Sequence, residues 1–193
     1  MNFSFFLVGI KNILFNPVKF WETIKSENTP AVLIRNSFLI PFSFLVALSS
    51  FFGSLLYVNS ELAPLYSVLV GIKCLLVIFI AVYSTSYLVS QITYPLDLGK
   101  NFNNSFRMVV VSITPFLMCQ ILSRLFESLL FVNIISFYGL YIFWIGAEKI
   151  LNPPQYKKMP LLIATSISFA GIYIVTDLLL GTIIDRFYFL FFV

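Results

Sequence analysis

Histidine is absent from the 193-residue chain, and Asp, Glu, Lys and Arg together make up only 10% of it. The absence of histidine excludes Ser-His-Asp and Cys-His nucleophiles, HExxH zinc sites and histidine ligation of haem. A soluble domain of this size carries about a quarter charged residues. The composition therefore also excludes an ordinary soluble globular protein.

Cysteine is equally scarce. Cys74 and Cys119 both fall inside apolar runs, where buried small side chains are a simpler interpretation than a disulfide or a pair of metal ligands. We therefore expect no cofactor and no metal.

Apolar residues are what the chain has in abundance. Hydrophobic residues make up 60% of it, with 23 Phe and 10 Tyr, and the mean hydropathy is +0.97. The aromatic content suits a lipid-facing surface with interfacial belts. The net charge of +4 is spread over short connections rather than gathered on one face, so we expect membrane lipids as partners and no nucleic acid.

The apolar runs predict an all-α fold: a polytopic transmembrane bundle of five helices preceded by an interfacial amphipathic helix. The clearest span covers residues 129–147 and ends at Glu148 and Lys149. We expect residues 1–29 to form an interfacial unit and residues 30–193 a membrane domain. The five predicted spans are residues 36–57, 66–92, 106–124, 129–147 and 159–181.

The amino-terminal stretch is too short to cross a bilayer. Residues 1–15 place apolar side chains at helical spacing, which is typical of an amphipathic helix in the interface. After Asn16-Pro17, a second short helix carries Trp21, which we predict to be an interface anchor. The basic pair Lys157 and Lys158, between the last two spans, is predicted to anchor the same interface.

The distribution of basic residues predicts the orientation of the spans. Nine of them fall on one predicted side: Lys11, Lys19, Lys25, Arg35, Lys100, Arg107, Lys149, Lys157 and Lys158. The opposite side has Arg124 and Arg186, with Lys73 in the second span able to reach it. Since cytoplasmic loops carry the excess of Lys and Arg, we expect a cytoplasmic amino terminus and an external carboxyl terminus.

Three residues predict local geometry. Pro115 in the third span leaves the carbonyl of Val111 without its donor, and this favours a kink that Ser112 or Thr114 can relieve. Gly139 and Gly146, seven residues apart in the fourth span, indicate a face where another helix packs closely.

Charged and polar residues inside the spans form the candidate site. The predicted topology places Lys73, Asn133 and Asp177 at a similar depth near the external side. A charge within a bilayer costs several kcal/mol unless it is paired, so we hypothesise a Lys73–Asp177 pair in a polar cluster that Asn133 joins. The alternative is that Lys73 and Asp177 each reach the interface unaided. The helical stripe of Asp177 also contains Ser166, Ala170, Tyr173 and Gly181, which are small or polar enough for close packing.

The last residues, FYFLFFV (residues 187–193), follow Asp185 and Arg186 and are too few to cross a membrane. We expect this tail to pack on the bundle or to lie in the interface.

Several motifs resemble the Yip family of Rab-GTPase-interacting membrane proteins and their bacterial relatives. They are NPVKFWETIK near the start; Gly99, Lys100 and Phe102 leading into the span with Pro115; and Tyr138, Tyr141 and Gly146 leading to NPPQYKKMP. The resemblance implies five spans with a cytoplasmic amino terminus and no established catalytic residues. The Asp-Leu-Tyr-Gly-Pro motif of eukaryotic members has no counterpart here, which favours a bacterial cytoplasmic (inner) membrane and argues against Rab binding.

The leading functional hypothesis is a non-enzymatic integral membrane protein of Yip type, acting in membrane organisation or in binding another membrane protein or a second copy of itself. The alternative is a small transporter, channel or lipid-moving protein that uses Lys73, Asn133, Pro115 and Asp177. An intramembrane enzyme is disfavoured, because no predicted span offers paired deep carboxylates or a Ser–Lys system.

Overall fold

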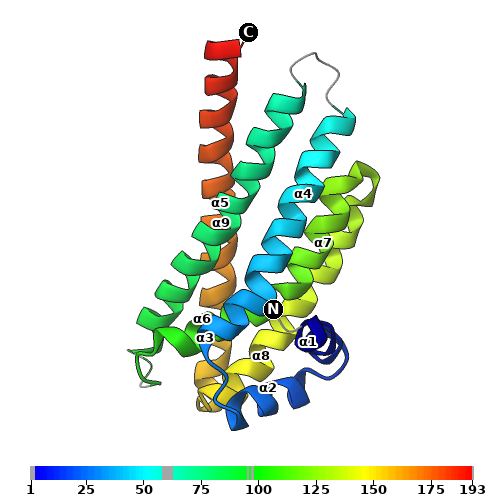
Figure 1. Ribbon diagram of the computed structural model, residues 1–193. Helices are drawn as coiled ribbons and strands as arrows, with labels where there is room; N and C mark the ends of the chain where they lie inside the picture. Colours follow the sequence, from blue (N-terminus) through cyan, green and yellow to red (C-terminus); the bar gives the residue numbers. More distant parts are fainter. Residues whose placement is uncertain (1–2, 58–62, 95, 97, 193) are drawn as a thin grey trace.

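The computed structural model describes residues 3–57, 63–94, 96 and 98–192. Within them every regular element is a helix. The predicted all-α polytopic bundle is confirmed. Four helices are long and apolar enough to cross a membrane, and a bent pair of shorter helices makes a fifth candidate. Figure 1 shows the long helices running side by side, with the short amino-terminal helices gathered at one end of the bundle.

The chain begins with two short helices, α1 (Phe3–Phe15) and α2 (Pro17–Ser26). Pro17 occupies the first turn of α2, where its missing N–H leaves no hydrogen bond unmade. Asn28 follows α2 with a φ of 44°, a left-handed conformation that asparagine tolerates better than most residues. This turn sends the chain into the first span.

The first span is continuous but not uniform. It runs through α3 (Ala31–Ile34), the π-helical turn η1 (Arg35–Leu39) and α4 (Ile40–Tyr57). It thus begins a few residues before the predicted start at residue 36. The second span, α5 (Ala63–Thr93), packs along α4.

The third span is broken into α6 (Phe102–Ser112) and α7 (Thr114–Leu125), which meet at an angle of 41°. The side chain of Asn101 caps α6 by accepting a hydrogen bond from the Asn104 N–H, with an N···O distance of 3.2 Å.

The fourth span corrects the expectation of a single α-helix over residues 129–147. Its first half is the 3₁₀-helix η2 (Glu127–Phe137), and only its second half, α8 (Tyr138–Ile150), is α-helical. A 3₁₀-helix rises about 2.0 Å per residue and eclipses residues three apart. The first half is therefore longer and narrower than an α-helix would be.

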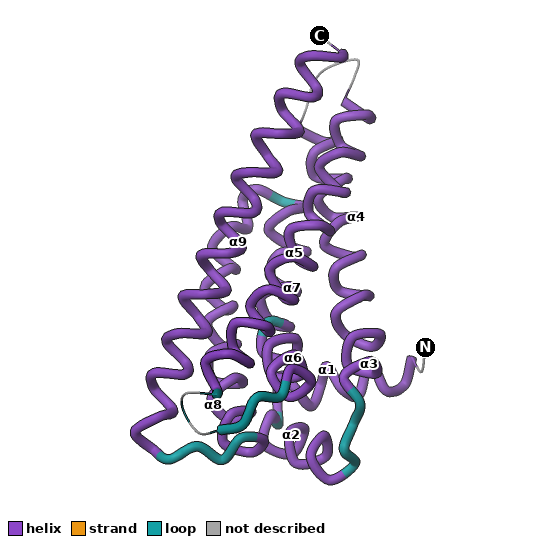
Figure 2. The backbone as a smooth tube through the Cα atoms, turned by 90° about the vertical axis from the view of Figure 1, so that its left-hand side faces the viewer, coloured by secondary structure: helices purple, strands orange, loops and turns teal. Residues whose placement is uncertain are grey.

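The fifth span, α9 (Gln155–Phe192), is one helix of 38 residues. The prediction that a separate tail follows residue 186 is wrong, because the helix continues through Asp185 and Arg186. At 1.5 Å per residue α9 is about 57 Å long, well beyond the roughly 30 Å of a hydrocarbon core. Figure 2 shows α9 extending past its neighbours at the carboxyl end.

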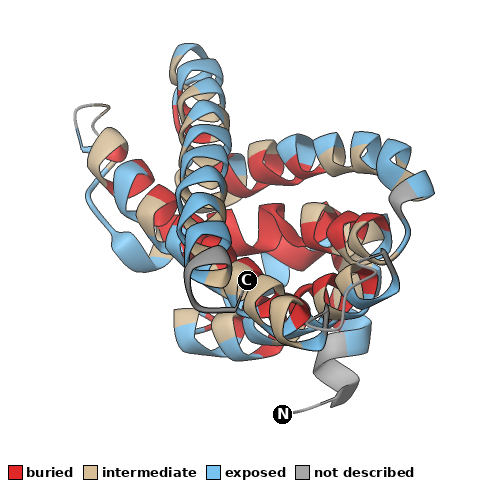
Figure 3. Ribbon diagram, turned by 90° about the horizontal axis from the view of Figure 1, so that it is seen from above, coloured by how far each residue is buried: buried red, intermediate tan, exposed pale blue. Residues whose placement is uncertain are grey.

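The core lies towards the end of the bundle where the amino-terminal helices dock. Buried apolar side chains come from α1, α2, η1, α6 and α8 together. By contrast, no residue in the most apolar stretch of α9 is fully buried. Seen from above, the buried residues gather in the middle of the molecule (Figure 3). This uneven packing leaves one side of α9 open, and the candidate site lies there.

Candidate functional site

A groove of about 760 Å³ separates α9 from the bent third span and from the fourth span. Phenylalanine rings from α7, η2, α8 and α9 and exposed aliphatic side chains line it. These residues are Phe116, Phe137, Phe143, Phe169, Leu130, Ile134, Ile167 and Ile174. The volume falls within the roughly 300–1,000 Å³ of pockets that hold drug-sized ligands. Since its rim side chains are exposed on a membrane-spanning surface, the groove opens towards lipid.

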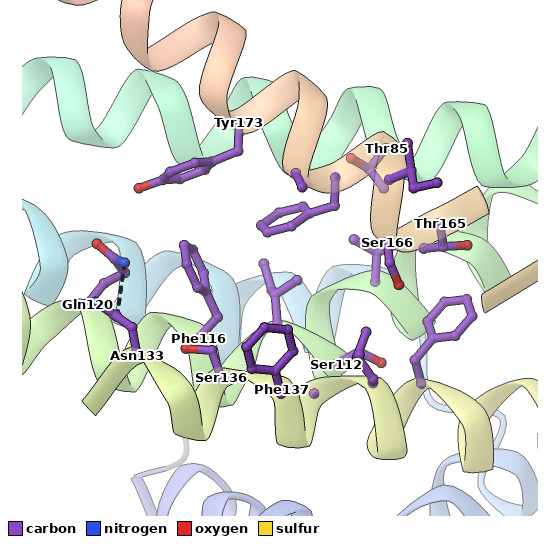
Figure 4. Close-up of a pocket in the computed structure, with 18 of the residues that line it drawn as sticks. Thr85, Ser112, Phe116, Gln120, Asn133, Ser136, Phe137, Thr165, Ser166 and Tyr173 are labelled. Carbon is purple, nitrogen blue, oxygen red and sulfur yellow. Dashed lines mark hydrogen bonds between the residues drawn. The ribbon is translucent and has the colours of Figure 1, made fainter. Parts of the chain in front are cut away.

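Polar side chains mark both ends of the groove. Gln120, Asn133 and Tyr173 lie at one end, whereas Ser112 and Thr165 lie at the other (Figure 4). The stripe of Ser166, Ala170 and Tyr173, predicted to pack closely against another helix, faces the groove instead. Ser166 and Ala170 leave room beside α9, whereas Tyr173 contacts Arg124 at 3.3 Å and packs against the Phe116 ring.

Three hydroxyls that line the groove lack a hydrogen-bond partner among the described residues. They belong to Thr85, Ser112 and Ser136. A buried hydroxyl without a partner costs about 1–3 kcal/mol. The three hydroxyl oxygens are themselves buried in the groove wall, so each would have to turn towards the groove to bond with a molecule that fills it.

A hydrogen-bonded network closes the end of the groove remote from the amino-terminal helices. Arg124 donates from Nε to Gln120 Oε1 at 3.1 Å and from Nη2 to the Tyr173 hydroxyl at 3.3 Å. Gln120 in turn donates to Asn133 Oδ1 at 3.3 Å. The network ties α7, η2 and α9 together at one level of the bundle.

Lys73 and Asp177 lie beside this network. Lys73 Nζ is 3.0 Å from Asp177 Oδ1, and the two side chains are 15% and 30% exposed. Asp177 is close enough to Arg124 to interact with it electrostatically. Further along the same two helices, the Tyr66 hydroxyl donates to Asp185 Oδ1 at 3.3 Å. Polar contacts thus join α5 to α9 at two levels.

Asn133 corrects one part of the expected cluster. Its side-chain oxygen accepts hydrogen bonds from Gln120 and, at 3.5 Å, from the Ser123 hydroxyl. It does not contact Lys73 or Asp177, because η2 lies across α7 from α5. Asn133 reaches that pair only through the chain of Gln120 and Arg124.

Pro115 lies in the first turn of α7, just after the break at Ile113. There its missing N–H cannot donate to the Val111 carbonyl, as expected from the sequence. The Thr114 hydroxyl donates to the Val110 carbonyl at 3.1 Å, whereas the Ser112 hydroxyl has no partner in the described residues. The bend directs α7 away from α9 and so helps to open the groove.

Gly139 and Gly146 each lie against a different neighbour. A Cβ on Gly139 would collide with the Ser112 carbonyl oxygen of α6. A Cβ on Gly146 would lie 2.7 Å from the indole of Trp21. The fourth span therefore packs closely on two partners, not on one helix.

The prediction that Trp21 anchors the membrane interface is wrong, because its side chain lies in the protein core. Its side chain is 0% exposed, and its Nε1–H donates to the Ile142 carbonyl at 3.1 Å. The indole fills the space that Gly146 leaves on α8. Trp21 thus fixes α2 to the fourth span.

Lys157 and Lys158 contact protein at the same end of the bundle. Lys157 Nζ donates to the Leu96 carbonyl at 2.6 Å. Lys158 pairs with Glu148 at 3.2 Å and lies 5.8 Å from the centre of the Trp144 ring. Lys149 and Glu22 form a further ion pair between α8 and α2. These basic residues hold the loops and helices of this end together.

The sequence did not single out Gln120, and it gave no reason to join Arg124 and Tyr173 in one network. The four-residue spacing of Gln120 and Arg124 is a signal for contact on one helix face. The partnership with Tyr173, 49 residues away, has no local signal, because it depends on how α9 crosses α7.

The side chains around the groove provide groups that suit binding. In the part of the chain that the structure describes, no three His, Cys, Asp or Glu side chains come together to hold a metal. The two cysteines are free and buried. The groove supplies apolar surface, hydroxyl and amide groups, and a cationic end.

Comparison with known proteins identifies the family. The Yip1 domain model matches residues 11–184, a range that begins within α1 and ends within α9. No curated protein and no solved structure matches the chain significantly. Because the match extends over most of the sequence, the chain belongs to the Yip1 domain family of membrane proteins.

Proposed function

We propose that this protein is a non-enzymatic, membrane-organising protein of Yip type, whose amino-terminal helices contact the cytoplasmic leaflet of a bacterial cytoplasmic membrane. In this proposal the amino terminus is cytoplasmic and the carboxyl terminus external. The Yip1 domain family consists of membrane proteins that are not known as enzymes, and a chain without histidine offers few catalytic alternatives.

The observation that carries the proposal is the two-sided character of α1. One side contributes Gly9 and the fully buried Ile13 to the core. The other side leaves Leu7, Val8 and Phe15 exposed, the last by 82%. An apolar outer surface beside membrane spans suits the boundary between headgroups and acyl chains. Lys11, which is exposed on that same side, can extend its ammonium group to the headgroups.

The second supporting feature is the attachment of these helices to the bundle. Trp21 and Ile24 of α2 are buried, and the Tyr138 hydroxyl donates to the Leu14 carbonyl of α1 at 2.8 Å. In Figure 1, α1 is seen nearly end-on, across the direction of the spans. A helix held in this way acts as a fixed wedge in one leaflet.

The attachment also decides how the proposal is tested. Deleting residues 1–27 would remove core side chains and unfold the bundle, so substitutions on the outer side of α1 are preferable. The test variant is Val8→Glu/Phe15→Glu, and the matched control is Thr23→Glu/Ser26→Glu, at exposed polar positions of α2. Both variants add the same charge.

The measurement is the shape of vesicles carrying the full-length protein at a fixed lipid ratio, imaged by electron cryomicroscopy. We expect wild type and control to give smaller or tubular vesicles and the α1 variant to give the shapes of empty vesicles. Identical shapes for all three proteins would contradict a leaflet-shaping role.

A further inference from the structure

We infer that the groove beside α9 binds one phospholipid, with the phosphate at Arg124 and an acyl chain along the phenylalanine-lined wall. This inference does not depend on the amino-terminal helices, which lie at the other end of the bundle. Three observations support it. They are a cluster of charges with an excess of one cation, a hydroxyl without a hydrogen-bond partner near that cluster, and the apolar wall of the rest of the groove.

The charge comes first. Lys73, Arg124 and Asp177 form a cluster of two cations and one carboxylate, and the carboxylate lies 3.0 Å from Lys73. The described part of the chain supplies no carboxylate at ion-pairing distance from Arg124, which donates to neutral groups on Gln120 and Tyr173. A charge inside a membrane protein is costly unless it is paired. A phosphate diester, with one negative charge, balances the cluster, and a guanidinium binds it through paired donors.

Next come the donors. Gln120 and Tyr173 line one end of the groove (Figure 4), and the Arg124 guanidinium lies directly behind them, within hydrogen-bond distance of both. One turn of η2 beyond Asn133 lies Ser136, whose hydroxyl has no partner in the described residues. In a phospholipid the ester carbonyls follow directly after the phosphate, and they are hydrogen-bond acceptors. Ser136 therefore lies where the ester carbonyls would follow the phosphate, whereas the other two unpartnered hydroxyls, those of Thr85 and Ser112, lie at the acyl-chain end.

The rest of the groove suits an acyl chain. From Tyr173 to Thr165 the lining positions on α9 extend over about 12 Å, at 1.5 Å per residue. Phe116 and Phe137 line this part (Figure 4), and so does Phe169. The groove is open on its lipid side, so a chain can enter from the bilayer without passing through water. An apolar hollow of this size is not left empty in a membrane, where acyl chains are the solvent.

The chain offers a matched pair of variants for the test. Ala170 lines the groove, whereas a Cβ on the adjacent Gly171 would meet nothing within 4 Å. Ala170→Phe therefore fills the groove, and Gly171→Phe places the same side chain on the outer surface of α9. A second pair, Arg124→Gln and Arg124→Lys, separates loss of the charge from change of the side chain.

The experiment is native mass spectrometry of the full-length protein in mild detergent, titrated with dioleoylphosphatidylglycerol. We expect wild type to bind one lipid with saturation, Gly171→Phe to match it, and Ala170→Phe to bind roughly tenfold more weakly. Arg124→Gln should also lose roughly tenfold, while Arg124→Lys keeps most of the affinity. Circular dichroism in the same detergent shows whether each variant is folded.

Several results would overturn the inference. If the wild-type protein binds no lipid stoichiometrically, the inference is wrong, whatever the variants do. Equal binding by Ala170→Phe and Gly171→Phe would place the lipid elsewhere. A dimer that Ala170→Phe dissociates would mean that a second copy of the chain, and not a lipid, occupies the groove.

Discussion

At the scale of the residue, burial decides what each side chain does in this protein. Tryptophan is a residue type that often anchors a membrane interface, but Trp21 lies in the core, because α8 provides Gly146 opposite it. Lys73 and Asp177, 104 positions apart, come within 3.0 Å. The sequence could indicate that intramembrane charges need a partner. It could not indicate that Trp21 and Ile142, 121 residues apart, would be hydrogen-bonded.

The Trp21 contact predicts a large loss of stability on truncation. Trp21→Ala should lower the free energy of unfolding by about 3–5 kcal/mol, because it leaves a cavity under α8. Trp21→Phe should cost about 1 kcal/mol through the lost hydrogen bond and some packing. Both losses are measured by unfolding each variant in mixed micelles with an increasing share of denaturing detergent. Phe15→Ala, at an exposed position, is the control, and equal losses for Phe15→Ala and Trp21→Ala would refute the packing argument.

The Lys73–Asp177 contact predicts a rescue. Asp177→Asn leaves Lys73 without its carboxylate and should lower the unfolding free energy by about 1–3 kcal/mol. The exchange Lys73→Asp/Asp177→Lys restores opposite charges at the same places and should recover most of that loss. The same unfolding series reports it. If the exchange variant loses as much stability as the sum of the losses of Lys73→Asp and Asp177→Lys alone, the two residues do not act as a pair.

At the scale of the element, the spans were predictable and their internal geometry was not. Runs of apolar residues indicate where candidate spans lie, because a bilayer requires a minimum length. The 3₁₀ conformation of η2 has no clear local signal in ESLLFVNIISF, whose residues suit an α-helix as well. The charged pair Asp185 and Arg186 suggested an end to the fifth span. Without proline or glycine after it, however, nothing stops the helix, and α9 continues to Phe192.

Glycine positions on two spans predict opposite effects of the same substitution. Gly139→Ala places a methyl group against the Ser112 carbonyl and should cost about 1–3 kcal/mol, since α6 and α8 must move apart. Gly171→Ala meets open space and should be neutral or stabilising by up to about 1 kcal/mol, as expected for glycine in a helix. Thermal unfolding of both variants in one detergent tests this. Equal destabilisation would mean that the close approach of α6 and α8 does not matter.

At the scale of the whole molecule, the structure has two distinct ends. One end gathers α1, α2 and the ion pairs of Lys149 and Lys158 into a tightly packed base. The other end is looser, with α9 beside the open groove and a cationic network. Composition predicted the membrane location and the sequence motifs predicted the family. The groove depends on how α9 leans against α5, and no local pattern in the sequence encodes that.

The proposal that α1 lies in one leaflet is tested most directly by its depth in the bilayer. A solvent-sensitive fluorophore is attached at Val8→Cys, with Lys25→Cys as the water-exposed control, in a protein whose Cys74 and Cys119 are replaced by serine. In liposomes, the label at position 8 should emit at short wavelength and be quenched by spin-labelled acyl chains. The label at position 25 should show neither effect. Water-like emission from both positions would contradict the proposed contact of α1 with the membrane.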